Sequence, residues 1–196
     1  MNIPFQQREA GLMSYPGDGW RKLFFKAPIQ LWRLGLGPII GYVMMLITHT
    51  GRRSGLPRRT MVEYHMLKGK KYAPCAFGRK SDWYKNIAAD PQVTIQTAYG
   101  VERMTAVRVT DDQELLAVYE LFKRRSPPLL NWYMQSLGIQ HNPADVLAKK
   151  DRIYWIRFDE TIKPTPPPLA TDLIWVWPVA LAGLLAFWRL SRKKEN

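Results

Sequence analysis

The chain has 196 residues, enough for one domain with appendages and a hydrophobic core of its own. Its formal net charge of +13 indicates an anionic partner. Charge alone does not decide whether that partner is nucleic acid, an anionic membrane or a small polyanion. The single cysteine, Cys75, excludes an internal disulfide. No apolar signal-peptide core follows Met1, so we expect the globular part to stay in the cytoplasm.

The N-terminal region is predicted to be an arm followed by short helices. Residues 1–18 show no periodicity, whereas 20–32 mix apolar, aromatic and basic residues, with Pro28 interrupting. This pattern predicts one or two helices that either lie on a membrane surface or cover the sheet of the domain. Glycines and Pro38 then end the helical pattern before the first strand.

The strongest local signal is a basic turn between two predicted strands, 43–48 and 58–67. Its glycines allow the backbone to turn with exposed amides, and its hydroxyl and guanidinium groups suit a phosphate or several carboxylates. Neighbouring residues of a strand point to opposite faces, so only one of Arg58 and Arg59 can face the anion, and we predict Arg58. The predicted anion site is Gly51, Arg52, Arg53, Ser54, Gly55 and Arg58.

A predicted strand over 72–77 is followed by a second basic turn and a predicted helix over 82–89. Ser81 is placed to cap the helix and Pro91 to stop it, so the helix N-terminal amides lie beside Gly78, Arg79 and Lys80. A strict period of two over 93–97 then predicts a strand with one solvated face.

The remaining pattern predicts a return strand over 101–109, helices over 115–122 and 129–137, and a last strand over 152–158. Thr110 and Gln113 have the spacing of a capping box before the first of these helices. The count is about six mostly antiparallel strands with inserted helices, which favours an α+β fold, a small barrel. The histidines His49, His65 and His141 lack metal-ligand spacing, so no metal is predicted.

The C-terminal region is predicted to be a membrane segment behind a proline-rich linker. Residues 173–188 are uncharged and apolar, with tryptophans near both ends. At about 1.5 Å per residue they span roughly 24 Å, against about 30 Å of hydrocarbon, so a spanning and an interfacial position both stay open. The predicted divisions are an arm (1–42), a cofactor-binding domain (43–160), a linker (161–171), a membrane segment (172–190) and a basic tail (191–196).

Two motifs together resemble the deazaflavin (F420)-dependent nitroreductase family: Leu-Ile-Thr-His-Thr-Gly-Arg-Arg-Ser-Gly-Leu-Pro-Arg, and, further along, Asp-Trp-Tyr-Lys-Asn-Ile-Ala-Ala-Asp-Pro-Gln-Val. The resemblance covers about residues 31–109 well, weakens over 113–158 and does not include the tail. It implies a split β-barrel, like those that bind FMN, holding coenzyme F420, whose side chain carries a phosphodiester and several glutamates.

The resemblance also implies roles for particular residues. The Gly51 to Gly55 turn and Arg58 would hold the phosphate and the glutamate arm. Trp83, Tyr84 and Asn86 would lie near the deazaflavin ring. Gly78, Arg79 and Lys80 are further candidates for binding the cofactor. Family nitroreductases use tyrosines around the ring, and Tyr133 is the candidate here to order the substrate or donate a proton.

We therefore predict an F420-dependent oxidoreductase at the cytoplasmic face of the cell membrane. Its partners would be F420, with FMN as the alternative, membrane lipid, and a small lipophilic acceptor such as a quinone or an unsaturated or nitro compound. A homodimer is allowed, and no nucleic acid is predicted. A non-catalytic carrier of a flavin-like cofactor is the alternative. A nucleic-acid- or lipid-surface-binding module would instead place basic residues along one face.

Overall fold

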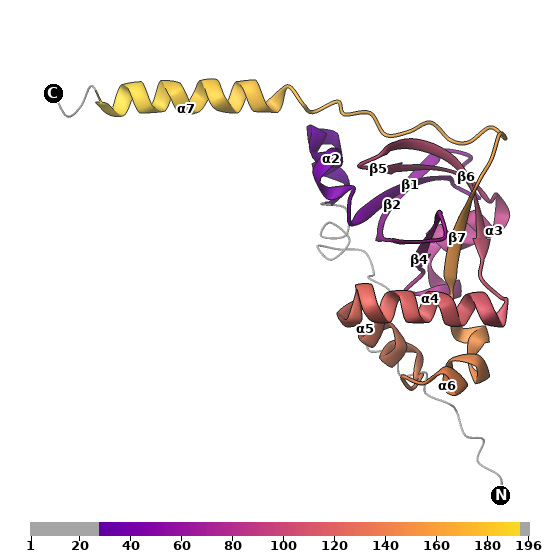
Figure 1. The fold of residues 1–196 in the computed structure, drawn as a ribbon. Helices are drawn as coiled ribbons and strands as arrows, with labels where there is room; N and C mark the ends of the chain where they lie inside the picture. Colours follow the sequence, from indigo (N-terminus) through magenta and orange to yellow (C-terminus); the bar gives the residue numbers. More distant parts are fainter. Residues whose placement is uncertain (1–27, 193–196) are drawn as a thin grey trace, which may run out of the picture.

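The structure is a computed structural model that describes residues 28–192, and it is organised around one antiparallel sheet (Figure 1). The sheet has seven strands in the order β2-β1-β5-β6-β7-β4-β3. All six neighbouring pairs are antiparallel. The strands are β1 (Met44–Thr50), β2 (Pro57–Glu63), β3 (His65–Leu67), β4 (Lys70–Pro74), β5 (Gln92–Thr97), β6 (Gly100–Arg108) and β7 (Trp155–Glu160).

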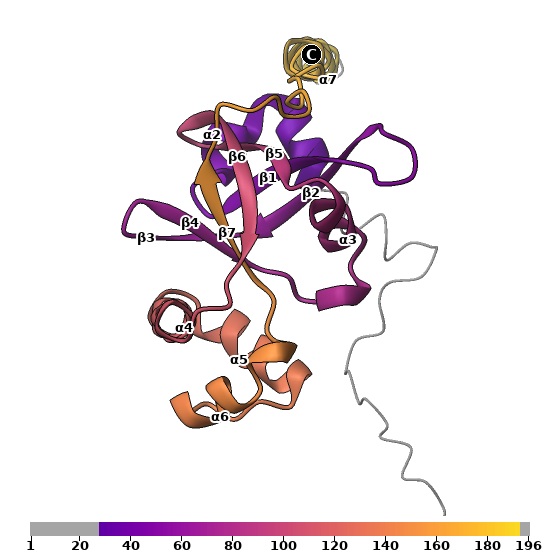
Figure 2. The same ribbon diagram turned by 90° about the vertical axis from the view of Figure 1, so that its right-hand side faces the viewer.

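Helices lie at both ends of this sheet. Figures 1 and 2 show α4, α5 and α6 grouped at one end and α7 at the other, reached by an extended segment. The helical elements are η1 (Trp32–Leu36), α2 (Gly37–Ile40), η2 (Gly78–Lys80), α3 (Asp82–Ala89), α4 (Asp112–Arg125), α5 (Pro127–Leu137), α6 (Pro143–Ala148), η3 (Lys150–Arg152) and α7 (Val176–Arg192).

The predicted α+β class is confirmed, but the predicted barrel of six strands is wrong, because the sheet is open and has seven strands. The extra strand arises at Tyr64, where the predicted strand 58–67 breaks. The hydroxyl of Tyr64 donates to the carbonyl of Gly41 at 3.0 Å, and its backbone N–H donates to Val43 at 3.3 Å. This anchor separates β2 from β3, which become the two edges of the sheet.

The segment 163–172, here called the strap, crosses the sheet instead of standing clear of it. The side chain of Thr94 on β5 hydrogen-bonds the strap at Thr165 and at the carbonyl of Pro166. Beyond the strap, Leu173 N donates to the carbonyl of Arg33 at 3.1 Å. The predicted solvated face of β5 is therefore covered, and Thr94 and Gln96 are buried.

The predicted C-terminal membrane segment is also wrong. Among residues 28–192, no helix combines the length and the apolar character that crossing a bilayer requires. The helix begins at Val176, after a turn, and its 17 residues extend about 26 Å, which is short of the roughly 30 Å of a hydrocarbon core.

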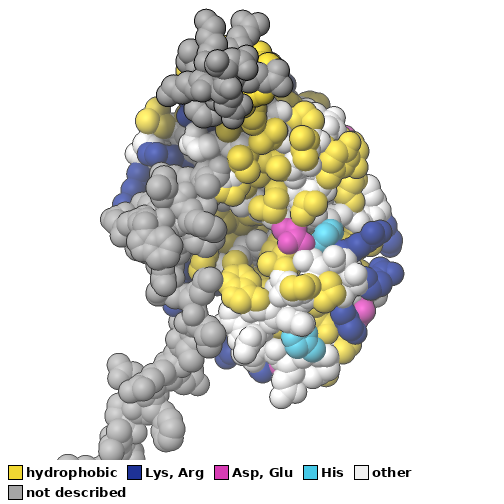
Figure 3. Space-filling view, turned by 90° about the vertical axis from the view of Figure 1, so that its left-hand side faces the viewer, with side chains coloured by type: hydrophobic (Ala, Val, Ile, Leu, Met, Phe, Trp, Pro, Cys, Tyr) yellow, Lys and Arg dark blue, Asp and Glu magenta, His cyan; other side chains and the backbone are white. Residues whose placement is uncertain are grey.

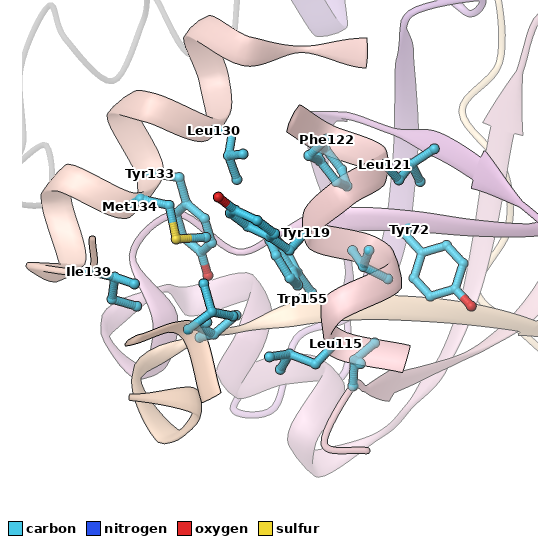
Figure 4. Close-up of a cluster of buried hydrophobic side chains, with 14 residues drawn as sticks. Tyr72, Leu115, Tyr119, Leu121, Phe122, Leu130, Tyr133, Met134, Ile139 and Trp155 are labelled. Atoms are coloured by element: carbon cyan, nitrogen blue, oxygen red, sulfur yellow. The ribbon is translucent and has the colours of Figure 1, made fainter. Parts of the chain in front are cut away.

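Two apolar clusters form the interior. One lies within the curve of the sheet and includes Ile47, Val93, Ile95 and Ile156, with Ile87 of α3 packed against it. The other joins α4 and α5 to β7, and Figure 4 shows its side chains gathered around Trp155. This second cluster holds the start of β7, next to Tyr154 of the candidate site.

The local helix signals were partly correct. Helix α3 has the predicted bounds, although the side chain of Ser81 makes no capping hydrogen bond. Helix α4 is capped by Asp111, whose carboxylate accepts from Glu114 N at 2.8 Å, and not by the predicted Thr110 box. The predicted arm and most of the predicted N-terminal helices lie outside the described residues.

Candidate functional site

The predicted anion turn is a closed loop between β1 and β2. Gly51 N donates to Leu56 O at 2.9 Å, and Gly55 N donates to Gly51 O at 2.8 Å. Gly55 has φ +67°, and a Cβ on Gly51 would stand 2.9 Å from Ser54 Oγ. Both positions therefore need glycine, one for its backbone conformation and one for space.

Arg52, Arg53 and Arg58 differ in what their side chains contact. Arg52 turns to α3, where its Nη1 donates to Asn86 Oδ1 at 2.9 Å and its Nη2 to Asp82 Oδ1 at 3.1 Å. Arg58 lies near Ser54, with 3.5 Å between Nη2 and Oγ. Arg53 is exposed and makes no hydrogen bond or ion pair with residues 28–192. Arg53 and Arg58 are thus the cations of the turn best placed for an external anion.

Asn86 joins α3 to the turn. Its Oδ1 accepts from the backbone N–H of Arg52 at 3.1 Å as well as from the guanidinium. Its Nδ2 lies 3.1 Å from Nδ1 of His49, the second-to-last residue of β1. His49 and Asn86 are 2% and 5% exposed, so this contact is shielded from solvent.

The imidazole of His49 is held neutral by its surroundings. Burial lowers its pKa to about 4, against an ordinary value of 6.5; Arg58, directly opposite on β2, acts in the same direction, and the backbone of Thr50 opposes them. A neutral ring has one nitrogen free to accept a hydrogen bond. His49 is therefore suited to accept from the Asn86 amide.

The second basic turn, residues 78–80, adjoins an aromatic wall formed by Tyr84 and Tyr154. Gly78, at φ +47°, lies so close to Tyr154 that a Cβ would stand 2.8 Å from the ring. Tyr84 meets Tyr154 edge to face at 4.8 Å between ring centroids, and the Arg108 guanidinium lies 4.0 Å above the Tyr154 ring. Arg79 and Lys80 are exposed, and Trp83 is partly buried against the sheet core.

Tyr133 lies beneath this wall and not at its surface. Its hydroxyl accepts from the backbone N–H of Tyr154 at 2.8 Å, and only 1% of the residue is exposed. Burial raises the pKa of Tyr133 well above its ordinary value. In this arrangement the hydroxyl fixes the position of Tyr154 and does not face solvent.

Arg58 and Arg59 are adjacent on β2, and the prediction that only Arg58 faces the anion stays a prediction. Arg59 pairs with Thr48 across the β1–β2 ladder, whereas Arg58 pairs with His49. Arg58 and Arg59 both line a groove of about 600 Å³ between the N-terminal helices, β2 and the strap. Arg58 therefore borders this groove as well as lying near Ser54 of the anion turn.

Four residues of this region were not identified from the sequence: His49, Asp82, Arg108 and Tyr154. The register of β1 against β2 could have pointed to His49, because it lies opposite Arg58. Arg108 and Tyr154 come together only through the β6–β7 end of the sheet, and no local motif marks either one.

A glycine-bounded turn with exposed arginines, hydrogen-bonded to a helix beside an aromatic wall, is a site for a ligand with an anionic arm and a flat ring. The chain belongs to the F420H2-dependent quinone reductase family, whose model matches residues 35–136. It is accordingly an F420-dependent oxidoreductase, and its cofactor is coenzyme F420.

The donor set fits this cofactor. F420 carries a phosphodiester and glutamate carboxylates, and the turn offers backbone amides together with Arg53 and Arg58. The Gly51 position, where a Cβ would stand 3.2 Å from Arg58 Cγ, keeps that arginine close to the turn. The match between anionic arm and cationic turn is one of charge and hydrogen-bond type.

No curated protein matches the chain significantly. Among solved structures, an F420H2-dependent reductase (FDR-A) has 20% identity and a TM-score of 0.46, covering 59% of this chain and 93% of its own. A domain-swapped dimer has 17% identity and a TM-score of 0.49, covering 72% and 100%. The heme storage protein HutZ from Vibrio cholerae has 12% identity and a TM-score of 0.43, covering 76% and 98%. At these scores none of the three bears on function.

Proposed function

We propose that this protein transfers reducing equivalents from F420H2 to a small lipophilic acceptor, with a quinone as the first choice. The observation that carries the proposal is the closed turn 51–55, which presents Arg53 and Arg58 and is tied to α3 through Asn86. The description of the family, F420H2-dependent quinone reductase, supports the choice of acceptor.

The chain's own residues bind and orient the cofactor. Arg53, Arg58 and the amides of the turn would hold the phosphodiester and carboxylates, and Ser54 adds a hydroxyl. When bound, F420H2 supplies a hydride. The edge-to-face pair of Tyr84 and Tyr154 would offer an apolar wall for a flat ring, and Arg108 stacked on the Tyr154 ring would keep that wall in place. Such packing excludes water from a ring that rests there.

Reduction of a quinone requires a proton in addition to the hydride. Tyr133, predicted from the sequence as its donor, stays a proposal. It supplies the proton only if its hydroxyl leaves the N–H of Tyr154, because that hydroxyl is buried. The alternative source of this proton is solvent, which reaches the exposed turn at Arg79 and Lys80.

Action on nitro compounds, membrane association and a homodimer also stay proposals. For location, we propose adsorption to the cytoplasmic face of the membrane, supported by the net charge of +13 and by exposed tryptophans such as Trp175 and Trp177. Hydrophobic side chains also cover much of the face in Figure 3. Co-sedimentation with anionic but not with neutral vesicles would support adsorption, and no co-sedimentation with either would refute it.

The test of the proposed activity is anaerobic oxidation of F420H2, followed by its absorbance, with a water-soluble quinone or a nitroaromatic compound as acceptor. We expect turnover with the quinone. Tight binding of F420 without turnover on either acceptor would indicate a carrier. Turnover with FMN in place of F420 would contradict F420 as the cofactor.

A further inference from the structure

We propose that Asn86 and His49 are positioning residues that hold the anion turn in its binding conformation before the cofactor arrives. The inference rests on the proposed function of the turn, and it assigns both residues a role without contact with the ligand. Three elements meet in this arrangement: β1 through His49, α3 through Asn86, and the turn through Arg52.

The carbonyl oxygen of Asn86 is fully engaged within the protein. It accepts two N–H groups of one residue, the backbone amide of Arg52 at 3.1 Å and its guanidinium at 2.9 Å. Asn86 is 5% exposed, so its side chain has little surface to offer a ligand. Its effect on an anion must therefore pass through the conformation of Arg52.

These two bonds also fix the orientation of the Asn86 amide. Because Oδ1 receives two donors, the group that lies 3.1 Å from His49 Nδ1 is the NH2, and it donates. His49 must then be neutral with Nδ1 unprotonated, which suits a buried ring opposite Arg58. His49 thus prevents the amide from flipping and presenting its NH2 to Arg52.

Arg52 is consequently an anchor of the turn more than a ligand for an anion. Its guanidinium reaches Asp82 Oδ1 at 3.1 Å and the Asp82 carbonyl at 3.4 Å, as well as Asn86. With Arg52 held against α3, the next residues, Arg53 and Ser54, are presented to solvent. A turn that is already ordered binds its ligand more tightly, because no conformational entropy of the turn is lost on binding.

The experiment compares Asn86→Ala with the matched control Asn131→Ala, which removes an exposed asparagine of α5. Two probes are titrated by fluorescence: F420 itself, and a truncated deazaflavin that lacks the phosphodiester and glutamates. We expect Asn86→Ala to weaken F420 binding by about tenfold to a hundredfold, as loss of a supporting hydrogen bond does at other sites. Binding of the truncated compound should change by less than about twofold, since it has no anionic arm for the turn.

Hydrogen exchange of the Arg52 amide in the free protein gives a readout that needs no cofactor. This amide should exchange slowly in the wild type and at least about tenfold faster in Asn86→Ala, since it loses its acceptor. His49→Leu should weaken F420 binding in the same direction, and should add little in the Asn86→Ala background, because the two residues act in series.

Three results would overturn the proposal. They are unchanged F420 affinity in Asn86→Ala, equal loss for both probes, and weakened F420 binding with unchanged Arg52 exchange, which would make Asn86 a direct ligand. If Asn86→Ala does not fold, Asn86→Ser replaces it and the same results apply. Failure of the wild type to bind F420 would defeat the proposed function, while Arg52 exchange would still test the positioning role.

Discussion

Gln96 and the backbone of Leu169 form a pair of hydrogen bonds between β5 and the strap. Gln96 Nε2 donates to Leu169 O at 3.0 Å, and Leu169 N donates to Gln96 Oε1 at 2.6 Å. One side chain thereby imitates the pairing that a neighbouring strand would give. This pair holds the strap against β5.

Replacing Gln96 with alanine should release the strap at this point. The loss of two partly buried hydrogen bonds is expected to lower the free energy of unfolding by about 1–3 kcal/mol, measured with urea. Proteolysis within 163–172 should also become faster. Gln135→Ala, at an exposed position of α5, is the control and should change neither quantity. Unaltered proteolysis in Gln96→Ala would show that other contacts suffice to hold the strap.

Tyr133 and Tyr119 form a matched pair for testing buried hydroxyl groups. Tyr133→Phe leaves the Tyr154 N–H without its acceptor and should lower the free energy of unfolding by about 1–3 kcal/mol. The hydroxyl of Tyr119 is buried and has no hydrogen-bond partner among the described residues, so Tyr119→Phe should be neutral or stabilising. A fall in kcat for Tyr133→Phe well beyond that of Tyr119→Phe would support the proton-donor role.

Gly78→Ala should destabilise the protein by more than its backbone conformation alone would, because the new Cβ would overlap the aromatic wall. This Cβ would stand 2.8 Å from Tyr154, whereas a Cβ at Gly69, also at positive φ, would meet nothing within 4 Å. We expect Gly69→Ala to cost about 1–2 kcal/mol for the backbone, and Gly78→Ala about 1–3 kcal/mol more for the overlap. Equal destabilisation of the two variants would contradict the close contact with Tyr154.

Stability should fall in acid partly because of His49. The unfolded chain takes up a proton at this residue near pH 6.5, but the folded protein does so only near pH 4. Stability is therefore lost as the pH falls from about 6.5 to about 4, and this contribution then levels off. A shift of this size corresponds to about 3 kcal/mol.

The measurement is the pH dependence of the urea midpoint in the wild type and in His49→Leu. Buried and paired carboxylates also reduce stability in acid, but they do so in both proteins, so the difference isolates His49. His141→Leu, at an exposed position, should leave the wild-type profile unchanged. Parallel profiles for wild type and His49→Leu would show that His49 is not held neutral.

Local signals predicted some elements well because the deciding interactions are local. Helix α3 runs over the predicted residues because Pro91 stops it and the chain before it is a turn. The turn between β1 and β2 also lies where its glycines predicted it. Both features depend on residues within a few positions of each other.

The errors arose where distant segments decide the structure. The solvated face predicted for β5 is covered because the strap, about 70 residues later, bonds Thr94 and Gln96. The break at Tyr64 depends on Gly41, and the contact of His49 with Asn86 spans 37 positions. Neither the periodicity of one segment nor a short motif carries information on such pairs.

The most direct test of the central claim, that the turn holds the anionic arm of F420, is the dissociation constant of F420 for wild type, Arg53→Gln and Arg58→Gln. Arg125→Gln, an exposed arginine of α4, is the control with the same change of charge. We expect each turn variant to weaken binding by about tenfold, an effect that high salt reduces, and the control to have little effect. Equal affinities in all four proteins would contradict the account.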